Sequence, residues 1–301
     1  MAESGCQTDR LQVVVVGGGA RSAQAFRRYV STKGKVELTI LVRKPVEPLP
    51  GETVIVVGDY FSPPEGLLSG KDAVVNFVGI TGTASEADLR SLNVEGPVRL
   101  ARYARAQGVK HFIHLSSLHI YGDAEFIDST TPEAPFSTYA RSKQSGDREL
   151  CDVAGEGFTV TNLRMPMHYG YGAGEKLRRL AAFMRRFGWF PVPRNRAVRS
   201  VVHLDNLSAA IAFLIEKRLG GIQFAADPEP FSLETLAEVA TARTGRAIRL
   251  VRLPEILFLP LRLFAKGVYR RLYMNNVISR DILLGTTYPV SLKEGLKDVL
   301  I

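Results

Sequence analysis

The fold is decided by the stretch Leu11-Gln12-Val13-Val14-Val15-Val16-Gly17-Gly18-Gly19-Ala20-Arg21-Ser22-Ala23. Its first six residues form a nearly continuous apolar run, which is typical of a strand buried on both faces. A Gly-rich turn follows, and a helical pattern then continues through Tyr29. This order of elements predicts that a dinucleotide pyrophosphate binds at the N-terminus of the helix, because the glycines allow close approach of the backbone.

The turn is a degenerate form of the dinucleotide-binding motif. Read as G-x-x-G-x-x-G from Gly17, the motif has Ala20 and Ala23 in place of its second and third glycines. Read as G-x-G-x-x-G, it has Ser22 in place of the third. Every replacement is small, so we expect the turn to keep its function. The predicted cofactor-binding residues of this turn are Gly17, Gly19, Ala20 and Arg21. The alternative is an ordinary connection between a strand and a helix.

The second predicted strand, 36–42, ends in Arg43 and Lys44. In a dinucleotide-binding sheet, an acidic residue at this place bonds the adenosine ribose 2′-hydroxyl, whereas an arginine accommodates a 2′-phosphate. Arg21 in the glycine turn is placed to reach the same phosphate. We therefore favour NADP over NAD as the cofactor. The alternative is NAD, with Arg43 and Lys44 as solvated surface charges.

Four further segments have the apolar content of sheet strands: 53–57, 72–79, 109–117 and 158–164. A helical pattern over 85–107 precedes the third of them, and 223–226 is predicted as a last strand. Alternation of this kind predicts an α/β fold with a doubly wound parallel sheet. Asp59 follows one strand, where it either accepts from an adenine amine or starts a helix. Gly79 ends another, where the backbone must pass the cofactor closely.

A second informative stretch runs from His114 to Lys143. Tyr139 and Lys143 are four residues apart, so on a helix they share one face. An ammonium there favours tyrosinate and so lowers the pKa of the phenol. Ser117 ends a predicted buried strand, and ligands of open α/β sheets bind beyond such strand ends. The three side chains predict a proton donor and acceptor set for carbonyl–alcohol chemistry, although a Tyr-x-x-x-Lys pattern alone also arises by chance.

Composition and charge bound the class of protein. The chain has 301 residues, of which 46% are apolar and 23% charged, as in ordinary globular proteins rather than disordered or fibrous ones. The formal net charge of +9 indicates affinity for anions. No nucleic-acid-binding motif accompanies this charge, so we expect no nucleic-acid partner.

The cysteines and histidines argue against disulfide and metal sites. Cys6 and Cys151 form no CxxC pair, and the five histidines have no paired ligand spacing. The N-terminus lacks the regions of a signal peptide, and no stretch approaches the ~20 apolar residues of a membrane span. We therefore expect no metal and a cytoplasmic protein.

The segment 256–273 combines apolar residues with Arg262, Lys266, Arg270 and Arg271. This pattern fits an amphipathic helix that lies on a membrane surface. The interpretation we favour is a helix of a substrate lobe with a solvated basic face, and membrane association is the alternative.

Together these features resemble the extended short-chain dehydrogenase/reductase family, in its branch of nucleotide-sugar epimerases, dehydratases and reductases. Segment 115–122 is similar to the family's Ser-Ser-x-x-Val-Tyr-Gly signature, and 164–170 to its strand-end segment after the active site. Segment 199–206 is similar to its Arg-x-x-x-His-Val-x-Asp segment. Residues 283–296 are similar to its closing pattern, with Thr286 where tryptophan is common. The resemblance spans about Leu11 to Leu300.

The resemblance implies roles for individual residues. Ser117 is implied to be the catalytic serine, Tyr139 the acid/base, and Lys143 its partner; Tyr139 and Lys143 also contact the cofactor. Arg199 is implied to bind a nucleotide diphosphate. The same comparison places Met165 at the cofactor and His119 and His168 at the substrate. Asn93 either orders a water, ribose or substrate contact or is a core amide bonded to the backbone.

The fold implied is a Rossmann-type sheet with a smaller C-terminal α/β substrate lobe. We expect a disordered tail over 1–10 and an NAD(P)-binding domain over 11–166, to which 199–226 return. The substrate lobe is expected over 167–198 and 227–301. Within it, the sequence predicts a basic helix over 177–187 and a rigid turn over 189–193. A homodimer through the two long helices is also implied.

Within the branch, the short length and the Arg43-Lys44 pair are most similar to the 4-ketoreductases of UDP-linked amino sugars. The implied reaction is NADP-dependent reduction of the 4-keto group of a nucleotide-linked deoxy amino sugar in surface polysaccharide synthesis. The alternative is a UDP-sugar 4-epimerase that keeps NAD bound. A second alternative is a non-catalytic cofactor-sensing or assembly protein, whose expected mark is a broken Ser/Tyr/Lys set; here the set is intact.

Overall fold

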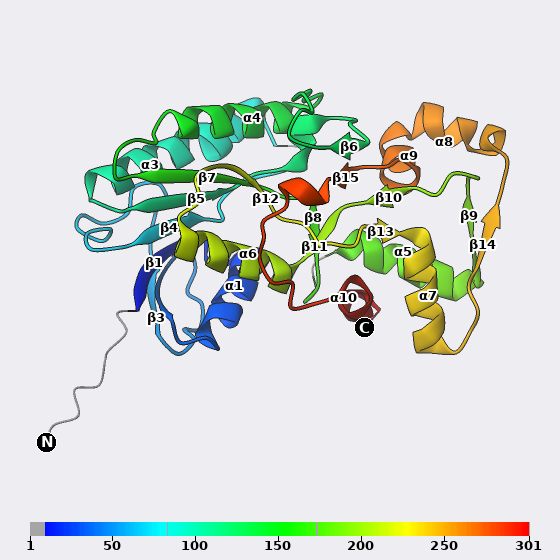
Figure 1. Ribbon diagram of the computed structural model, residues 1–301, viewed down its shortest axis with the longest axis horizontal. Coiled ribbons are helices and arrows are strands. Elements are labelled where there is room, and N and C mark those ends of the chain that lie inside the picture. Colours follow the sequence, from blue (N-terminus) through cyan, green and yellow to red (C-terminus); the bar gives the residue numbers. More distant parts are fainter. Residues whose placement is uncertain (1–9, 83, 173, 301) are drawn as a thin grey trace, which may run out of the picture. The chain divides into compact units, whose positions relative to one another are not determined.

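The computed structural model describes residues 10–82, 84–172 and 174–300, which divide into two compact units (Figure 1). The first unit comprises the chain up to Leu115, Ser142–Asn162 and Ile211–Ile222. The second comprises Ser116–Arg141, Leu163–Ala210 and Gln223 onward. The segment 116–141, which we expected in the cofactor-binding domain, groups with the second unit. Residues 1–9 of the expected tail lie outside the described residues.

The main sheet has seven strands in the order β12-β7-β5-β4-β1-β2-β3. Their bounds are β1 Leu11–Val16, β2 Val36–Val42, β3 Glu52–Val56, β4 Ala73–Asn76, β5 His111–Leu115, β7 Thr159–Arg164 and β12 Gly221–Phe224. The pairs from β3 to β5 are parallel. Because β1 lies between β2 and β4, the chain reverses its direction of travel across the sheet there, and ligands of such sheets bind at that point. The predicted α/β fold class is confirmed.

The core of the first unit follows from its valine-rich strands. Val13 to Val16 of β1 are fully buried, and they pair with β2 on one side and β4 on the other. A strand covered on both faces needs apolar residues at every position, which explains the continuous run. Phe112 of β5 and Leu100 of a flanking helix belong to the same apolar cluster as Val14 and Val16.

The helices of the main sheet connect its strands. Their bounds are α1 Arg21–Ser31, α2 Glu86–Arg90, α3 Gly96–Ala106, α4 Thr138–Cys151 and α6 Leu204–Lys217. The predicted helix over 85–107 is present, but a π-helical segment, Ser91–Glu95, joins α2 to α3. Ser85 caps the first of these helices, because its side chain accepts from the Asp88 N–H.

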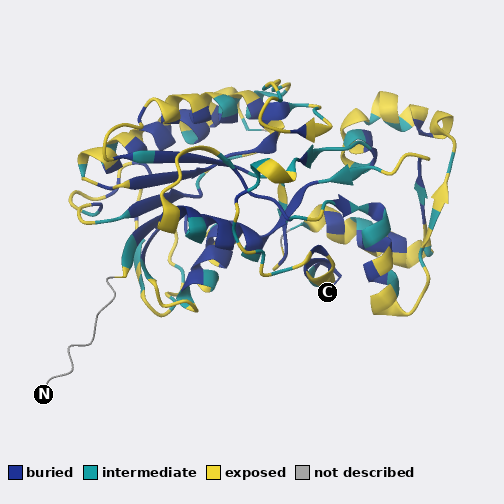
Figure 2. Cartoon of the chain, in the orientation of Figure 1, coloured by how far each residue is buried: buried dark blue, intermediate teal, exposed yellow. Residues whose placement is uncertain are grey.

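The second unit is built from helices and short two-stranded pairs. The pairs are β6 Phe126–Ile127 with β15 Val277–Ile278, β8 Met167–Tyr169 with β11 Val201–His203, β9 Trp189–Val192 with β14 Arg249–Arg252, and β10 Val198–Arg199 with β13 Phe231–Ser232. The helices are α5 Glu175–Phe187, α7 Leu233–Thr244, α8 Leu259–Phe264, α9 Lys266–Tyr273 and α10 Leu292–Val299. Three 3-10 turns span Leu118–Tyr121, Glu255–Phe258 and Arg280–Ile282. Figure 2 shows that buried residues are concentrated in the main sheet and occur in parts of α5, α7 and α10.

The rigid turn predicted over 189–193 is wrong, because Trp189–Val192 is strand β9, paired in parallel with β14. Phe190 and Val192 are buried while Trp189 is exposed, so the side chains alternate as they do in a strand. Proline has no N–H to give to a ladder, but its carbonyl can still accept. The Pro191 carbonyl accepts from the Tyr273 hydroxyl at 2.9 Å, so the one proline of this strand still has a hydrogen-bond partner.

A buried ion pair ties α1 to β3 and to the glycine turn. The Arg27 guanidinium binds both carboxylate oxygens of Glu52, at 2.8 and 2.6 Å, and the two side chains are 5% and 1% exposed. Arg27 also donates to the carbonyls of Gly18 and Glu47. Removing one partner of such a pair leaves a buried charge without its counterion.

We expect Arg27→Met to lower the free energy of unfolding by about 3–5 kcal/mol, measured by urea denaturation. Arg179→Ala is the matched control, because its ion pair with Glu175 is solvent-exposed and we expect a much smaller loss. Equal losses in the two variants would contradict the role given to the buried pair.

Candidate active site

The glycine turn after β1 has the shape that a pyrophosphate site requires. Gly17 has a φ of +84°, and a Cβ at Gly18 would fall 2.1 Å from the Ile40 methyl carbon, so both positions need glycine. Sequence reasoning did not single out Gly18. A Cβ at Gly19 would meet no described atom within 4 Å, so the space beside it is open. Helix α1 begins directly after Ala20, which provides no side-chain cap.

This turn fits a dinucleotide. The first helix N–H groups are left for an anion, and the first turn of α1 carries no acidic residue. Arg21 is exposed at the start of the helix. The turn also follows β1 at the point where the strand order reverses.

The residues after β2 and β3 are held by each other. The Arg43 guanidinium lies 5.3 Å from the centre of the Tyr60 ring, and the Arg43 backbone N–H donates to the Tyr60 hydroxyl at 3.2 Å. Asp59 accepts from the Phe61 N–H and pairs with Arg99 at 2.7 Å. Arg43 and Lys44 are both exposed. Asp59 therefore organises the turn after β3. It does not start a helix, because the next described element along the chain is β4, and its contact with an adenine amine stays a prediction.

Asn93 lies in the π-helical segment and is fully buried. Its side chain accepts from the Ile80 N–H at 2.9 Å, and donates to the Ile80 carbonyl and the Ser142 hydroxyl, both at 3.0 Å. A Cβ at Gly79 would fall 3.2 Å from the Asn93 amide oxygen. The second alternative for Asn93, a core amide bonded to backbone, is thus the one that the contacts favour.

Lys143 of α4 is buried against the carboxyl end of β5. Its Nζ donates to the Leu115 carbonyl at 2.7 Å and lies 2.7 Å from His114 Nε2. Burial lowers the pKa of Lys143 to about 8, while the Asp147 carboxylate opposes this shift. Burial and the Lys143 cation hold the pKa of His114 well below its ordinary value. The contact with His114 was not predicted, because the sequence does not show which strand faces α4.

Ser117, His119 and Tyr139 lie together in the second unit. The Ser117 Oγ is 3.0 Å from His119 Nδ1 and accepts from the His119 N–H at 3.2 Å. The His119 and Tyr139 rings make an edge contact with centroids 5.7 Å apart. Burial, followed by the nearby cations, chiefly Arg199, lowers the pKa of His119. A neutral imidazole therefore lies between the serine hydroxyl and the tyrosine.

The other predicted residues lie on neighbouring elements. The Met165 carbonyl accepts from the Leu118 N–H at 3.1 Å. His168 of β8 is half-buried opposite Val202 of β11. Arg199 donates from Nη1 to two backbone carbonyls, those of Arg270 and Met274, at 3.0 and 3.2 Å. Burial and then Arg271 lower the pKa of Arg199.

Arg164 is a buried residue that sequence reasoning missed. It is the largest fully buried side chain among the described residues, and it donates to the Tyr121 hydroxyl at 2.6 Å and pairs with Glu133. Tyr121 belongs to the Tyr-Gly signature and Arg164 ends β7, so the two motifs are joined through this contact. Only the tyrosine in that signature gave a signal in the sequence.

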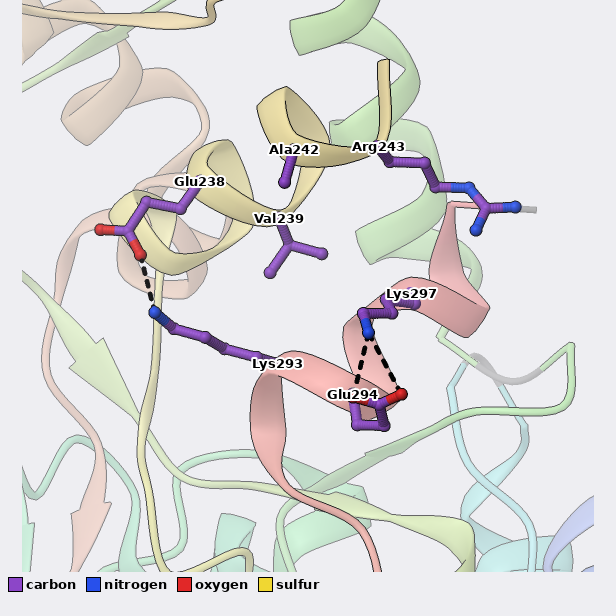
Figure 3. Close-up of a pocket in the computed structure, with 7 residues that line it drawn as sticks. All are labelled: Glu238, Val239, Ala242, Arg243, Lys293, Glu294 and Lys297. Atoms are coloured by element: carbon purple, nitrogen blue, oxygen red, sulfur yellow. Dashed lines mark hydrogen bonds and ion pairs between the residues drawn. The ribbon is translucent and has the colours of Figure 1, made fainter. Parts of the chain in front are cut away.

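A hollow away from the predicted site residues shows no sign of a ligand site. The hollow has a volume of about 470 Å³ and lies between α7 and α10. Figure 3 shows the residues that line it. Four of its charged residues are paired, Lys293 with Glu238 at 3.1 Å and Lys297 with Glu294 at 3.0 Å. No predicted site residue is among the described residues that line it. The described residues contain no group of three or more potential metal ligands.

Within 10–82, 84–172 and 174–300, we find no helix with the length and apolar content to cross a bilayer.

Two curated proteins are similar to this chain over most of its length. UDP-glucose 4-epimerase of Vibrio cholerae is 24% identical over 229 residues, which cover 69% of this chain and 67% of that protein. The 3beta-hydroxysteroid dehydrogenase/Delta(5)-Delta(4) isomerase 1 of Caenorhabditis elegans is 26% identical over 207 residues. That match covers 62% of this chain but 44% of the relative, so the chain spans less than half of its length.

Solved structures share the fold over almost the whole chain. MoeE5 in complex with UDP-glucose and NAD has a TM-score of 0.71 and 18% identity, over 96% of this chain and 97% of that one. RMD from Pseudomonas aeruginosa complexed with NADPH has a TM-score of 0.66 and 18% identity, over 96% and 98%. Residues 14–224 match the sequence pattern of one protein family. The chain therefore belongs to the NAD dependent epimerase/dehydratase family.

Proposed function

We propose that this chain is an NADP-dependent oxidoreductase that reduces the 4-keto group of a UDP-linked deoxy amino sugar. One observation carries the proposal: Tyr139 and Lys143 share α4, with Lys143 buried at the end of β5 and Tyr139 beside His119 and Ser117. The same residue types on the same elements are expected of an enzyme that moves a proton to or from a carbonyl oxygen.

The cofactor would be held by the first unit. The backbone of Gly17, Gly18 and Gly19 and the start of α1 would bind the pyrophosphate. Arg43 stands after β2, where an acidic side chain would instead favour NAD. When bound, the nicotinamide supplies the hydride. NAD stays the alternative, since similar folds are known with NAD and with NADPH.

The proton would come from Tyr139. Its hydroxyl would donate to the oxygen of the substrate carbonyl as that oxygen gains negative charge. Lys143, one helical turn further on, would stabilise the resulting tyrosinate in its ammonium form and hold the cofactor ribose. Ser117 would bind the same oxygen. His119, neutral and bonded to Ser117, would fix the orientation of the serine hydroxyl.

The substrate's diphosphate would be bound by cations of the second unit. Arg199 has one Nη fixed by backbone carbonyls, which orients its guanidinium plane; His168 lies on a strand of the same unit. A diphosphate suits a guanidinium, because two parallel N–H groups can bind two oxygens. Proteins of the same fold are known with UDP-glucose and with UDP-glucuronic acid, and this supports a UDP-sugar. A role in surface polysaccharide synthesis, a homodimer and a cytoplasmic location stay predictions.

A UDP-sugar 4-epimerase is the second candidate, and one observation favours it. The Vibrio cholerae relative, which aligns with 69% of this chain, is a UDP-glucose 4-epimerase. Such an enzyme would interconvert two UDP-hexoses without net change in the cofactor. Arg43 after β2 is our reason for ranking the reductase first.

Tyr139→Phe should lower kcat by about 10²–10⁴-fold, because it removes the only proton that the phenol can give. The dissociation constant for NADPH should stay within twofold of the wild-type value. Turnover is measured as NADPH oxidation with a UDP-4-keto sugar, and binding by fluorescence titration. Tyr103→Phe, at a half-buried position of α3, is the matched control and should leave kcat unchanged. Wild-type kcat in Tyr139→Phe would eliminate the proposed acid.

Arg43→Glu should raise the KM for NADPH at least tenfold and leave the KM for NADH unchanged or lower, because it places a carboxylate where a 2′-phosphate would lie. The ratio of kcat/KM for the two cofactors is the measurement. Lys35→Glu makes the same change of charge at another exposed position near β2 and should not alter the ratio. An unchanged ratio in Arg43→Glu would refute NADP selection by this residue.

A further inference from the structure

The segment 255–273, called here the apolar arm, exposes several large apolar side chains to solvent. It contains the 3-10 turn Glu255–Phe258, α8 and α9 and is largely exposed in Figure 2. The exposed large apolar residues of the arm are Ile256, Leu257, Leu259, Leu263, Phe264 and Val268. Phe264 is 89% exposed and Ile256 73% exposed. Contiguous apolar exposure of this kind marks an interaction surface.

The arm is anchored, so its apolar residues are held outward by the fold. Phe258 and Tyr273 are buried and their ring centroids are 5.1 Å apart. Tyr269 packs against Tyr273 at 5.6 Å. Pro260 sits in the first turn of α8, where the absence of an N–H is tolerated. Three aromatic anchors, with the partly buried Leu261 and Leu272, therefore pack on the core, while the six exposed apolar side chains face solvent.

Cations border the exposed apolar residues. Between residues 246 and 273 the chain has seven basic residues and one acidic residue, Glu255. Arg262, Lys266 and Arg271 are exposed on the arm, whereas Arg270 pairs with Asp123. We expected a helix with a solvated basic face, but the apolar side chains of the arm are solvated as well.

We propose that the apolar arm docks onto an anionic lipid surface. Apolar side chains flanked by Lys and Arg match the boundary between acyl chains and acidic head groups. A second copy of this chain fits less well, because a two-fold interface would place the arm's cations against the same cations of the partner. An acidic lipid supplies both the apolar phase and the opposite charge.

The test is co-sedimentation of the full chain with vesicles of phosphatidylcholine alone or with 30% phosphatidylglycerol, on the order of 0.1 M salt. We expect binding to the anionic vesicles at least tenfold tighter than to the neutral ones, weakening as salt rises. Leu263→Glu/Phe264→Glu and Arg262→Glu/Lys266→Glu should each abolish it. Val56→Glu, at an exposed apolar position on β3, is the matched control and should bind normally.

Three results would overturn the proposal. One is no binding to anionic vesicles. Another is equal binding by the wild type and both arm variants. The third is a wild-type dimer, seen by sedimentation velocity, that the arm variants convert to monomer without any loss of vesicle binding.

A second, independent observation concerns the hydrogen-bond chain that ends at Lys143. The Asn76 amide oxygen accepts from the Val78 N–H at 3.0 Å, so the Asn76 amide nitrogen must face His114 Nδ1, also at 3.0 Å. An amide nitrogen only donates, and His114 Nδ1 therefore accepts. A neutral His114 then carries its proton on Nε2, which lies 2.7 Å from Lys143 Nζ.

This arrangement leaves one proton too many if Lys143 is an ammonium. An ammonium has three donors and no acceptor, so its contact with the His114 Nε2–H would set donor against donor. A neutral amine has a lone pair for that N–H and keeps a proton for the Leu115 carbonyl. The only other titratable group found to act on Lys143 among the described residues is Asp147, on its own helix, and it favours the ammonium.

We infer that His114 is a positioning residue that sets the protonation of Lys143. Asn76 fixes the tautomer of His114, and His114 favours the neutral amine of Lys143. The lowered pKa of Lys143 agrees with this direction. The role of Lys143 in turnover rests on the proposed function, but its protonation in the free protein does not.

The experiment titrates Lys143 by NMR in the free protein, with ¹⁵N-labelled lysine and histidine. His114→Phe removes the N–H donor and should raise the pKa of Lys143 by about one unit. His111→Phe is the matched control: His111 is buried on the same strand but contacts Thr161, and its replacement should leave Lys143 unchanged. In the wild type, His114 should show the Nε2–H tautomer, which needs no variant to fold.

An unchanged Lys143 titration in His114→Phe, or an Nδ1–H tautomer for His114, would overturn the inference. If the enzyme reduces ketosugars as proposed, the alkaline fall in kcat should move up with the NMR titration. If the NMR titration of Lys143 shifts in His114→Phe but the wild-type protein shows no turnover of ketosugars, the proposed function is refuted and this inference stands.

Discussion

The proposed function depends on the burial of one amino group, the Nζ of Lys143. Removing an ammonium from water costs several kcal/mol unless its protons are taken up by the protein. Here the Leu115 carbonyl at the end of β5 accepts from Nζ, while the contact with His114 Nε2, 2.7 Å away, favours the neutral amine. A lysine in this setting pins α4 to the sheet. Because Tyr139 lies one turn earlier on the same helix, the contacts of Lys143 also constrain the position of the Tyr139 backbone.

A buried side chain also supports the glycine turn after β1. The turn after β1 has no side chain to hold it, because its residues are glycines. Arg27 supplies that support from α1, since it donates to the Gly18 carbonyl while both oxygens of the buried Glu52 bind its guanidinium. The glycine turn can therefore keep space beside Gly19 and still be held in one conformation.

Much of the fold could be predicted, because parallel strands buried on both faces have a simple signature. The valine run of β1 and its glycine turn indicated the sheet, and the strand order confirmed the doubly wound class. The short pairs of the second unit were harder, since their strands have only two to four residues and β9 contains a proline. Their pairing depends on distant partners that periodicity does not reveal.

The candidate site was predictable as residue types but not as contacts. Tyr139, Lys143 and Ser117 were found from spacing and signature, because helix geometry relates residues four apart. His114 and Asn76 were not, since each belongs to a strand whose neighbour is set by topology rather than by sequence distance. Arg164 was missed for the same reason, because Tyr121 lies 43 positions before it.

The most direct measurement of the central claim is isotope transfer. The chain is incubated with NADPH deuterated at the transferable C4 position and with a UDP-4-keto-6-deoxy amino sugar, and the product is read by mass spectrometry and NMR. We expect one deuterium at C4 of the sugar for each cofactor oxidised. A cofactor that stays reduced, with no deuterium in the sugar, would contradict it.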